Sequence, residues 1–154
     1  MSIHLTPLDP ETDLQRVVEL SAYDSCESLS VERYRSLEKS LPRGTVRFQV
    51  AATLACRRIV GFAEIVHQRT MPSGHFHFRL IVDREERGRG IGAMLYDDLL
   101  QFAREQGATR LSVDVLMSAT EGLRFATTRG FNVAIGDGES SDCPDYYRLV
   151  RDLS

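Results

Sequence analysis

The segment REERGRGIGAML, residues 84–95, carries three arginines and three glycines directly after the apolar run FRLIVD. Glycine at the alternate positions Gly88, Gly90 and Gly92 permits dihedral angles that turn successive backbone N–H groups toward one point. If a helix begins here, its first N–H groups have no intrahelical partners and its dipole adds positive charge. The arginines add charge-assisted donors. The pattern therefore predicts a phosphate or pyrophosphate site, in preference to a glycine turn beside a solvated run of charge.

Two other phosphate-binding motifs compete for this segment. The P-loop pattern G-x-x-x-x-G-K-[ST] does not occur in the chain, so a P-loop is excluded. A Rossmann-type turn is closer, because Gly88-x-Gly90-x-x-Ala93 opens a helix and Asp114 follows about twenty residues later. Against it, REER separates the strand from the glycines, and three antiparallel strands are expected before the unit. A Rossmann-type dinucleotide-binding domain is therefore the less favoured interpretation.

Hydrophobic periodicity and turn residues predict the element order β-α-α-β-β-β-α-β-α-β-β. The expected strands are residues 3–9, 46–56, 59–69, 74–83, 110–116, 131–135 and 145–153. The first three helices are expected at 11–23, with Leu14, Val17, Val18 and Tyr23 on one face, at 30–41, with Ser30 as N-cap, and at 91–105, with Gly107 as C′ residue. The fourth is opened by a Ser118-to-Glu121 capping box and ended by Gly130.

The connections between these elements predict the fold class. Short turns join the strands 46–56, 59–69 and 74–83, which favours an antiparallel meander. The helix 91–105 joins strands 74–83 and 110–116, which should therefore be parallel with a right-handed crossover. We expect an α+β fold: one domain, residues 1–154, with a mixed, mostly antiparallel sheet flanked by helices around a central parallel β-α-β unit.

Composition excludes several classes of protein. The chain has 154 residues, 42% of them hydrophobic and 27% charged, and no apolar run long enough to span a membrane. No secretory signal opens the sequence. The three cysteines lie far apart and show neither zinc spacing nor a disulfide framework, which fits a reducing cytoplasm. A net charge of −3 argues against bulk nucleic-acid binding.

Arg87-x-x-Gly90-x-Gly92 resembles the Q/R-x-x-G-x-G/A signature of the GCN5-related N-acetyltransferases, the GNAT superfamily. The stretch 80–115 is similar to the family's central strand, pyrophosphate loop, helix and next strand. The segment LRFATTRGF is similar to its later helix, which ends in Gly-Phe. The resemblance covers essentially the whole chain. It implies acetyl-CoA, or another acyl-CoA, as donor and direct transfer to a primary amine in a ternary complex, with no metal.

The resemblance also implies where the cofactor binds. The glycine-rich loop should hold the pyrophosphate through backbone N–H groups, and backbone groups of Leu80 and Val82 should pair with the pantetheine arm like an added strand. The family's central parallel strands splay apart at this point, which leaves an N–H of 80–82 to polarise the thioester carbonyl. The cofactor-binding residues are expected to be Leu80, Ile81, Val82, Arg87, Gly88, Arg89, Gly90, Ile91, Gly92 and Ala93.

An amine attacks a thioester only when neutral, so a base must take its proton. The resemblance implies a base on the strands before the signature, where Glu64, His67, His75 and His77 occur. Glu64 has apolar neighbours in sequence, so burial could raise its pKa, although an outward-facing strand glutamate is an equal alternative. His75 and His77 alternate with two phenylalanines and share the opposite face, toward solvent or substrate. Among the histidines we prefer His77, which lies nearer the strand centre.

The family's usual acid is a tyrosine four residues before the Gly of Gly-Phe, where this chain has Ala126. An asparagine common in the same region is also missing, with Ala119 at roughly that position. Water, Ser118, Tyr146 or Tyr147 could protonate the leaving thiolate instead, and Tyr146 is our candidate. The alternative is a non-catalytic acyl-CoA-binding or regulatory domain that kept the loop and lost the acid.

The identity of the acceptor is not encoded in a recognisable motif. A small-molecule or peptide amine is expected, bound between residues 14–41, the 69–75 turn and the loop 136–145, with no nucleic acid and no membrane as partner. Exposed edge strands make a homodimer a further expectation.

Overall fold

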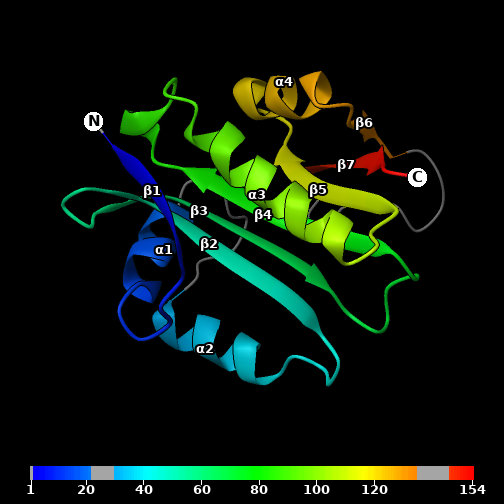
Figure 1. The fold of residues 1–154 in the computed structure, drawn as a ribbon, viewed down its shortest axis with the longest axis horizontal. Coiled ribbons are helices and arrows are strands. Elements are labelled where there is room, and N and C mark those ends of the chain that lie inside the picture. Colours follow the sequence, from blue (N-terminus) through cyan, green and yellow to red (C-terminus); the bar gives the residue numbers. More distant parts are fainter. Residues whose placement is uncertain (1, 22–29, 135–145) are drawn as a thin grey trace.

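The computed structural model describes residues 2–21, 30–134 and 146–154. One seven-stranded sheet runs through the molecule in the order β1-β2-β3-β4-β5-β7-β6 (Figure 1). Its strands are β1 (Ile3–Pro7), β2 (Val46–Leu54), β3 (Ile59–His67), β4 (His75–Val82), β5 (Arg110–Leu116), β6 (Asn132–Val133) and β7 (Tyr146–Asp152). The helices are α1 (Leu14–Ser21), α2 (Val31–Lys39), α3 (Ile91–Glu105) and α4 (Thr120–Thr128), with a short 3₁₀ helix at Arg84–Glu86.

The pairing confirms the predicted fold class. All neighbouring strands are antiparallel except β4 and β5, which are parallel and joined through α3. The predicted order of elements is also confirmed. This topology puts the glycine-rich segment between the end of β4 and the start of α3.

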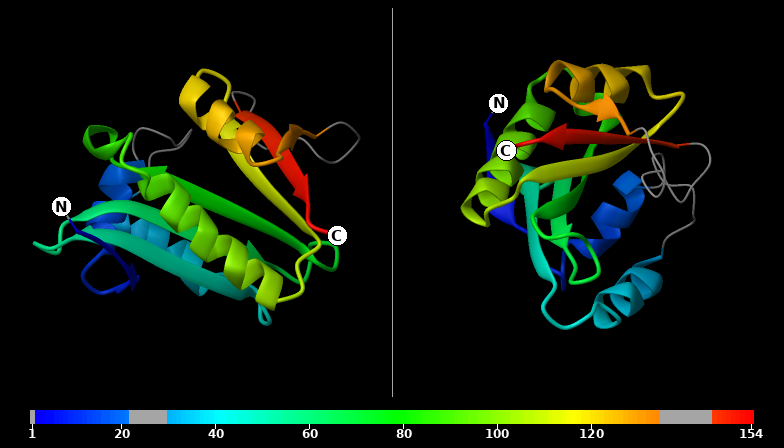
Figure 2. Two further views of the ribbon diagram at one scale, coloured as in Figure 1. Left: turned by 45° about the horizontal axis from the view of Figure 1, so that its top comes forward. Right: turned by 90° about the vertical axis from the view of Figure 1, so that its right-hand side faces the viewer.

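The helices cover opposite faces of the sheet, because side chains alternate along each strand. In β3, Phe62 packs with Leu14 and Val17 of α1 and with Tyr34 of α2. The next residue, Ala63, belongs to the cluster that contains the apolar face of α3. Figure 2 shows α3 and α4 on one side of the sheet and α1 and α2 on the other. The sheet thus presents one face to α3 and α4, and a second face to the N-terminal helices.

The Ser30 N-cap and the two C-terminal glycines are confirmed, whereas the first helix begins at Leu14 and not at residue 11. Ser30 Oγ accepts a hydrogen bond from the Arg33 N–H at 3.1 Å. Gly107 and Gly130 follow their helices with φ of 76° and 87°, the left-handed region in which glycine is favoured. In α1 the buried positions include Leu14, Val17 and Leu20, whereas Val18 is half-buried. Tyr23 lies outside the described residues.

The predicted capping box is wrong. The fourth helix begins at Thr120, and its N-cap is Ala119, which makes no side-chain cap bond. The reason is a tight turn directly after β5, in which the Ala119 N–H donates to the Leu116 carbonyl at 2.9 Å. Ser118 belongs to that turn and therefore lies one position too early to cap the helix.

None of the helices in the described ranges combines the length and the apolar composition that crossing a bilayer requires. The loop predicted at 136–145 lies outside the described residues.

Candidate functional site

The glycine-rich loop leaves the first N–H groups of α3 without a cap. Gly88 and Gly90 adopt positive φ values of 84° and 79°, and Gly90 is the N-cap, with no side-chain cap bond. The first intrahelical bond runs from the Met94 N–H to the Gly90 carbonyl at 3.1 Å. The N–H groups of residues 91–93 therefore precede the helical hydrogen-bond pattern and point out of the helix end. Together with the dipole of a fifteen-residue helix, they form a site suited to an anion.

The glycines of this loop serve two different purposes. A Cβ built at Gly88 or Gly90 would have no atom within 4 Å, so these two residues supply backbone conformation beside open space. A Cβ at Gly92 would lie 3.3 Å from Cε2 of Phe125 on α4. Gly92 therefore allows α3 to approach the Phe125 ring of α4 closely.

The arginines of the loop are held by carboxylates. Arg89 Nη1 lies 2.8 Å from Glu86 Oε2, and Arg87 Nη1 lies 3.6 Å from Glu121 Oε2 of α4. Both guanidinium groups remain partly exposed, so an incoming anion could exchange for the carboxylates. Their electrostatic contribution in this arrangement is smaller than that of unpaired arginines.

Asp83 anchors the start of the loop to α1. Its Oδ2 lies 2.6 Å from Arg16 Nη2, and its Oδ1 accepts a hydrogen bond from the Glu85 N–H at 3.0 Å. Burial alone would raise the pKa of Asp83, but the Glu85 N–H and the Arg16 guanidinium outweigh burial and hold the pKa below its usual value. The loop thus begins at a fixed, ionised carboxylate.

Strands β4 and β5 separate beside the loop. Their last pair is Phe78 with Val113, although β4 continues to Val82 and β5 to Leu116. The left view in Figure 2 shows the two strands diverging toward the N-terminal end of α3. A seven-stranded sheet with such a divergence exposes backbone groups in its middle, where a ligand strand could pair with them.

The hydrogen bonds at the two ends of β4 reveal which backbone groups face the divergence. The Gly74 carbonyl accepts from the N–H groups of Thr109 and Arg110, whereas the Asp83 N–H donates to Val60 of β3. Because backbone direction alternates along a strand, even-numbered residues face β5 and odd-numbered residues face β3. The backbone groups of Leu80 and Val82 therefore face the divergence. Those of Ile81, which the sequence analysis included in the cofactor site, face β3.

His77 takes part in a polar network on the face that carries α1 and α2. Its Nδ1 lies 2.8 Å from Ser112 Oγ, and its Nε2 lies 3.9 Å from Asp114 Oδ2, which is too long for a hydrogen bond. Arg148 of β7 donates from Nε and Nη2 to the two oxygens of Asp114, at 2.5 and 3.1 Å. The network joins β4, β5 and β7 next to the point of divergence.

The predicted alternation in β4 is confirmed. Phe76 and Phe78 are each 4% exposed in the cluster under α3, and His75 and His77 are half-buried on the opposite face. The pairing of β4 with β3 is regular from Val66–His77 to Gly61–Val82, so no bulge changes the facing of these residues. His67 is oriented differently: its Nδ1 lies 2.7 Å from the His75 carbonyl, and its ring packs against Phe76.

The structure surrounds Glu64 with polar groups and not with an apolar pocket, the first of its two expected environments. Side chains alternate between the two faces of a strand, so the apolar residues next to Glu64 in the sequence face α3. Glu64 itself faces the other way and lies among polar groups. Arg47 Nε donates to Oε1 at 2.9 Å, and the Tyr34 hydroxyl donates to Oε2 at 3.2 Å. Arg47 also lies 2.7 Å from Glu38 of α2. This cluster connects β2 and β3 to α2.

Tyr34 is the buried centre of that cluster. Burial, followed by the charge of Glu64, raises its pKa to about 12. Its hydroxyl donates to Glu64 and accepts from Gln49 Nε2 at 3.0 Å. The phenol is therefore protonated across the physiological range and acts as a hydrogen-bond bridge between the sheet and α2.

We expect Tyr34→Phe to lower the free energy of unfolding by about 1–2 kcal/mol, because Glu64 and Gln49 lose a buried partner. Urea denaturation measures this change, with the exposed Tyr147→Phe as a control that should change stability by less than about 0.5 kcal/mol. The raised pKa also implies that the contribution of Tyr34 is fully present below pH 10 and is lost as the pH rises toward about 12. Equal stability of Tyr34→Phe and the wild type would contradict this assignment.

Ala126 occupies the position of the family's usual acid, and the three candidate acids Tyr146, Tyr147 and Ser118 lie elsewhere. Ala126 is buried in α4 within the core cluster. Tyr146 pairs with Leu116 at the end of β5, and its parity puts it on the face of Asp114 and Arg148. Tyr147 is 36% exposed on the other face, and Ser118 lies in the turn after β5. Tyr146 is thus the candidate that shares a face with His77.

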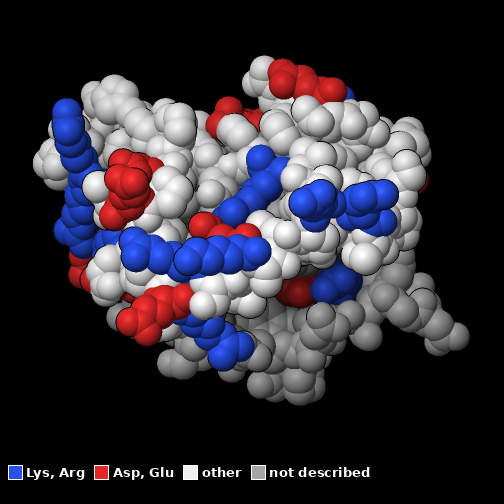
Figure 3. Space-filling view, turned by 90° about the horizontal axis from the view of Figure 1, so that it is seen from below, with Lys and Arg blue, Asp and Glu red and all other residues white. Residues whose placement is uncertain are grey.

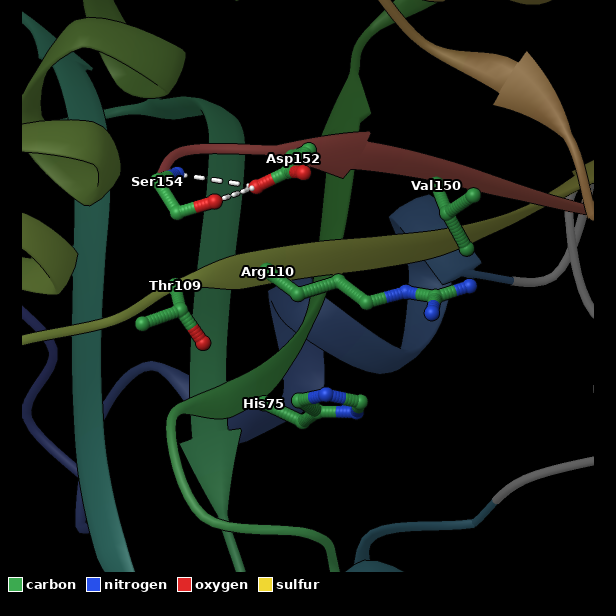
Figure 4. Close-up of a pocket in the computed structure, with 6 residues that line it drawn as sticks. All are labelled: His75, Thr109, Arg110, Val150, Asp152 and Ser154. Atoms are coloured by element: carbon green, nitrogen blue, oxygen red, sulfur yellow. Dashed lines mark hydrogen bonds between the residues drawn. The ribbon is translucent and has the colours of Figure 1, made fainter.

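A separate cavity of about 440 Å³ lies at the other end of β4 and β5, away from the loop. It is lined by His75, Thr109, Arg110, Val150, Asp152 and Ser154 (Figure 4). Figure 4 shows His75 and Arg110 beside each other, while Ser154 folds back and donates to Asp152. The predicted base candidates His75 and His77 therefore lie toward different ends of the parallel pair. In the part of the chain that the structure describes, no three His, Cys, Asp or Glu side chains form a group that could hold a metal ion.

Three features occur together in this chain: a glycine-rich loop at the start of a helix, two parallel strands that diverge beside it, and the order of the elements. Residues 15–131 match the acetyltransferase (GNAT) family. The chain belongs to this family. The predictions of a GNAT fold and of an acetyl-CoA-dependent N-acetyltransferase agree with this membership, and the Rossmann-type alternative does not.

Solved structures support the fold at low sequence identity. A GCN5-related N-acetyltransferase from Kribbella flavida is 20% identical, with 98% of each chain covered and a TM-score of 0.74. yncA from Salmonella typhimurium, whose structure contains its cofactor acetyl-CoA, is 13% identical over 100% of this chain and 95% of that one, with a TM-score of 0.76. PaiA N-acetyltransferase from Thermoplasma acidophilum, in complex with coenzyme A, is 19% identical over 99% of each chain, with a TM-score of 0.69. No curated protein matches the chain.

Sequence reasoning missed the partners of the candidate base residues. Ser112 and Asp114 alternate along one strand, and Arg148 occupies the matching face of another, but only the register between strands brings them to His77. The alternation itself was a readable signal that these side chains share a face. Their partners could not be assigned without the pairing.

Proposed function

We propose that the protein transfers an acetyl group from acetyl-CoA to a primary amine by direct attack in a ternary complex. The observation that carries this proposal is the uncapped N-terminus of α3 beside the divergence of β4 and β5. The first feature suits a pyrophosphate and the second suits an extended arm that ends in a thioester. Membership of the acetyltransferase (GNAT) family supports the same conclusion.

The residues of the loop fit acetyl-CoA on two counts. There is open space beside Gly88 and Gly90, and the N–H groups of residues 91–93 precede the helical bonding. We assign the pyrophosphate to the N–H groups of this loop, with Arg87 and Arg89 as flanking cations. Backbone groups of Leu80 and Val82 would pair with the pantetheine arm. Acetyl-CoA supplies the activated acetyl thioester, whose carbonyl one of these N–H groups would polarise.

We propose His77 as the base that takes the proton from the acceptor ammonium. It lies one residue before the last β4–β5 pair, on the face opposite α3, and Ser112 orients its ring. A neutral imidazole can accept a proton and is a common general base. Both oxygens of Glu64, by contrast, already accept hydrogen bonds within the α2 cluster. We therefore propose that Glu64 has a structural role, holding α2 and β2 against β3 on the acceptor face.

For the proton that the departing thiolate needs, we propose Tyr146. The position of the usual tyrosine is occupied by Ala126, which is buried and has no donor. Tyr146 lies at the end of β5 beside the divergence, on the face of His77. The missing hydroxyl at position 126 is also what favours the second candidate, an acyl-CoA-binding domain without turnover.

Thiol release tests the two candidates directly. The protein is mixed with acetyl-CoA and a panel of amines, amino acids and short peptides, and free CoA thiol is followed by a chromogenic disulfide. Acceptor-dependent thiol release, with the acetylated amine identified by mass spectrometry, supports the transferase. Calorimetric binding of CoA without turnover of any acceptor would favour the binding domain.

A further inference from the structure

Arg79 lies where β4 leaves β5. The last pair of the two strands is Phe78 with Val113, so Arg79 is the first residue of β4 beyond it. Arg79 lies two residues after His77 in the same strand, so both side chains lie on the face of α1 and α2. An acceptor that reaches the thioester from this face must pass the Arg79 side chain, because Leu80 follows it directly.

Arg79 is half-buried, and the groups that contact its guanidinium do not neutralise its charge. Nη2 donates to Ser21 Oγ at 3.1 Å, and Ser21 is 2% exposed. Cζ lies 5.8 Å from the centre of the Phe62 ring. Nε is buried and has no hydrogen-bond partner among the described residues. A buried donor without a partner is unfavourable unless a ligand satisfies it.

The other two arginines of the polar clusters differ from Arg79. Arg47 is bonded to Glu38 and Glu64, and Arg148 is bonded to Asp114. Within the described ranges, no carboxylate oxygen lies within 4 Å of the Arg79 guanidinium. Glu64 stands directly opposite it across β3 and β4, but its oxygens accept from Arg47 and Tyr34. Arg79 therefore carries a positive charge for which its surroundings supply no ion pair.

A guanidinium with available donors matches the planar geometry of a carboxylate. A carboxylate that pairs with the accessible part of this guanidinium would neutralise its charge. A second ammonium, as in a polyamine, would instead bring like charges together in a partly dry site. The molecular surface seen from below Figure 1, the side of α1 and α2, intermixes basic and acidic side chains rather than forming a broad acidic patch (Figure 3).

We propose that Arg79 binds a carboxylate of the acceptor, and that the acceptor is consequently a small amine that also bears a carboxylate, such as a free amino acid. This inference rests on the proposed acetyl transfer for the position of the acceptor. In this proposal Arg79 determines substrate specificity, because its guanidinium binds the carboxylate. His77, two residues earlier on the same face, receives the proton of the amine.

Isothermal titration calorimetry on the CoA complex tests the proposal without requiring turnover. The probes are a set of L-amino acids and the carboxamide of each. We expect at least one amino acid to bind, and its carboxamide to bind at least about tenfold more weakly, because an amide cannot form the charge-assisted pair. Absence of binding by every amino acid, or equal binding of acids and amides, would overturn the proposal.

Three variants separate recognition from packing. Arg79→Met should weaken binding of that amino acid about 100-fold, because the carboxylate loses its charged partner. Arg79→Lys, which keeps the charge but not the fork, should lose less, and Arg104→Met, at an exposed site on α3, should bind as the wild type does. CoA affinity should stay unchanged in all three. Unchanged amino-acid binding in Arg79→Met would contradict the assignment, whereas failure of thiol release with every acceptor would refute the transferase proposal alone.

Discussion

Gly90→Glu is expected to weaken CoA binding by at least about 100-fold, because a carboxylate at this N-cap would face the pyrophosphate at close range. The substitution meets open space, since no atom lies within 4 Å of the position of a Cβ. It does place a side chain at φ +79°, which should lower the free energy of unfolding by about 1–2 kcal/mol. Calorimetry with CoA measures the affinity, and urea denaturation measures the stability.

Gly107→Glu provides a matched control at the opposite end of the same helix. Gly107 also has positive φ, +76°, and also has open space around its Cβ position. The backbone strain and the added charge are therefore nearly the same, but the carboxylate lies at the C-terminal end of α3. We expect a similar loss of stability with unchanged CoA affinity. If both variants bind CoA normally, or both lose it equally, the loop is not the pyrophosphate site.

His77→Gln is expected to lower kcat/KM for the acceptor by about 10²–10⁴-fold, the usual contribution of a general base. CoA affinity should be unchanged, because His77 lies on the face opposite α3. The wild-type rate should fall at acidic pH, since a protonated imidazole cannot accept the ammonium proton. Steady-state thiol release between pH 5.5 and 9 measures both effects.

His75→Gln and Glu64→Gln distinguish this role from nearby alternatives. His75 has the same residue type, strand and face, but it lines the cavity at the far end of the parallel pair. We expect its variant to retain most of the wild-type rate and pH profile. Glu64→Gln should mainly reduce stability, because it removes the negative charge that pairs with Arg47. A larger loss of kcat in Glu64→Gln than in His77→Gln would make Glu64 the base.

Local chemistry made much of the fold predictable. The glycines at 88, 90, 107 and 130 adopt positive φ, and each lies at a helix boundary that the sequence indicates. The alternation of His75 to Phe78 predicted which side of β4 faces the core, and burial confirms it. The Ser118 capping box failed because a tight turn after β5 competes for the same residues. Boundary signals are thus reliable where the backbone conformation itself selects the residue, as it does for glycine.

The environment of Glu64 required the tertiary structure. Its neighbours in sequence are apolar, but they face α3, and its neighbours in space come from α2 and β2. The same holds for His77, whose partners Ser112 and Asp114 lie more than thirty residues away in the sequence. Such contacts depend on strand register, which local periodicity does not specify.

The sequence by itself determined that a strand, a glycine-rich turn and a helix follow one another, because glycine conformation and helix dipole are properties of a short segment. It thereby indicated the proposed anion site and carried the resemblance to the GNAT superfamily. Only the tertiary structure decided which side chains face the acceptor, because parallel pairing of β4 with β5 and the antiparallel return of β7 align distant residues. Among the described residues it also gives Arg79 no carboxylate partner at the divergence, a consequence of strand register that no local pattern contains.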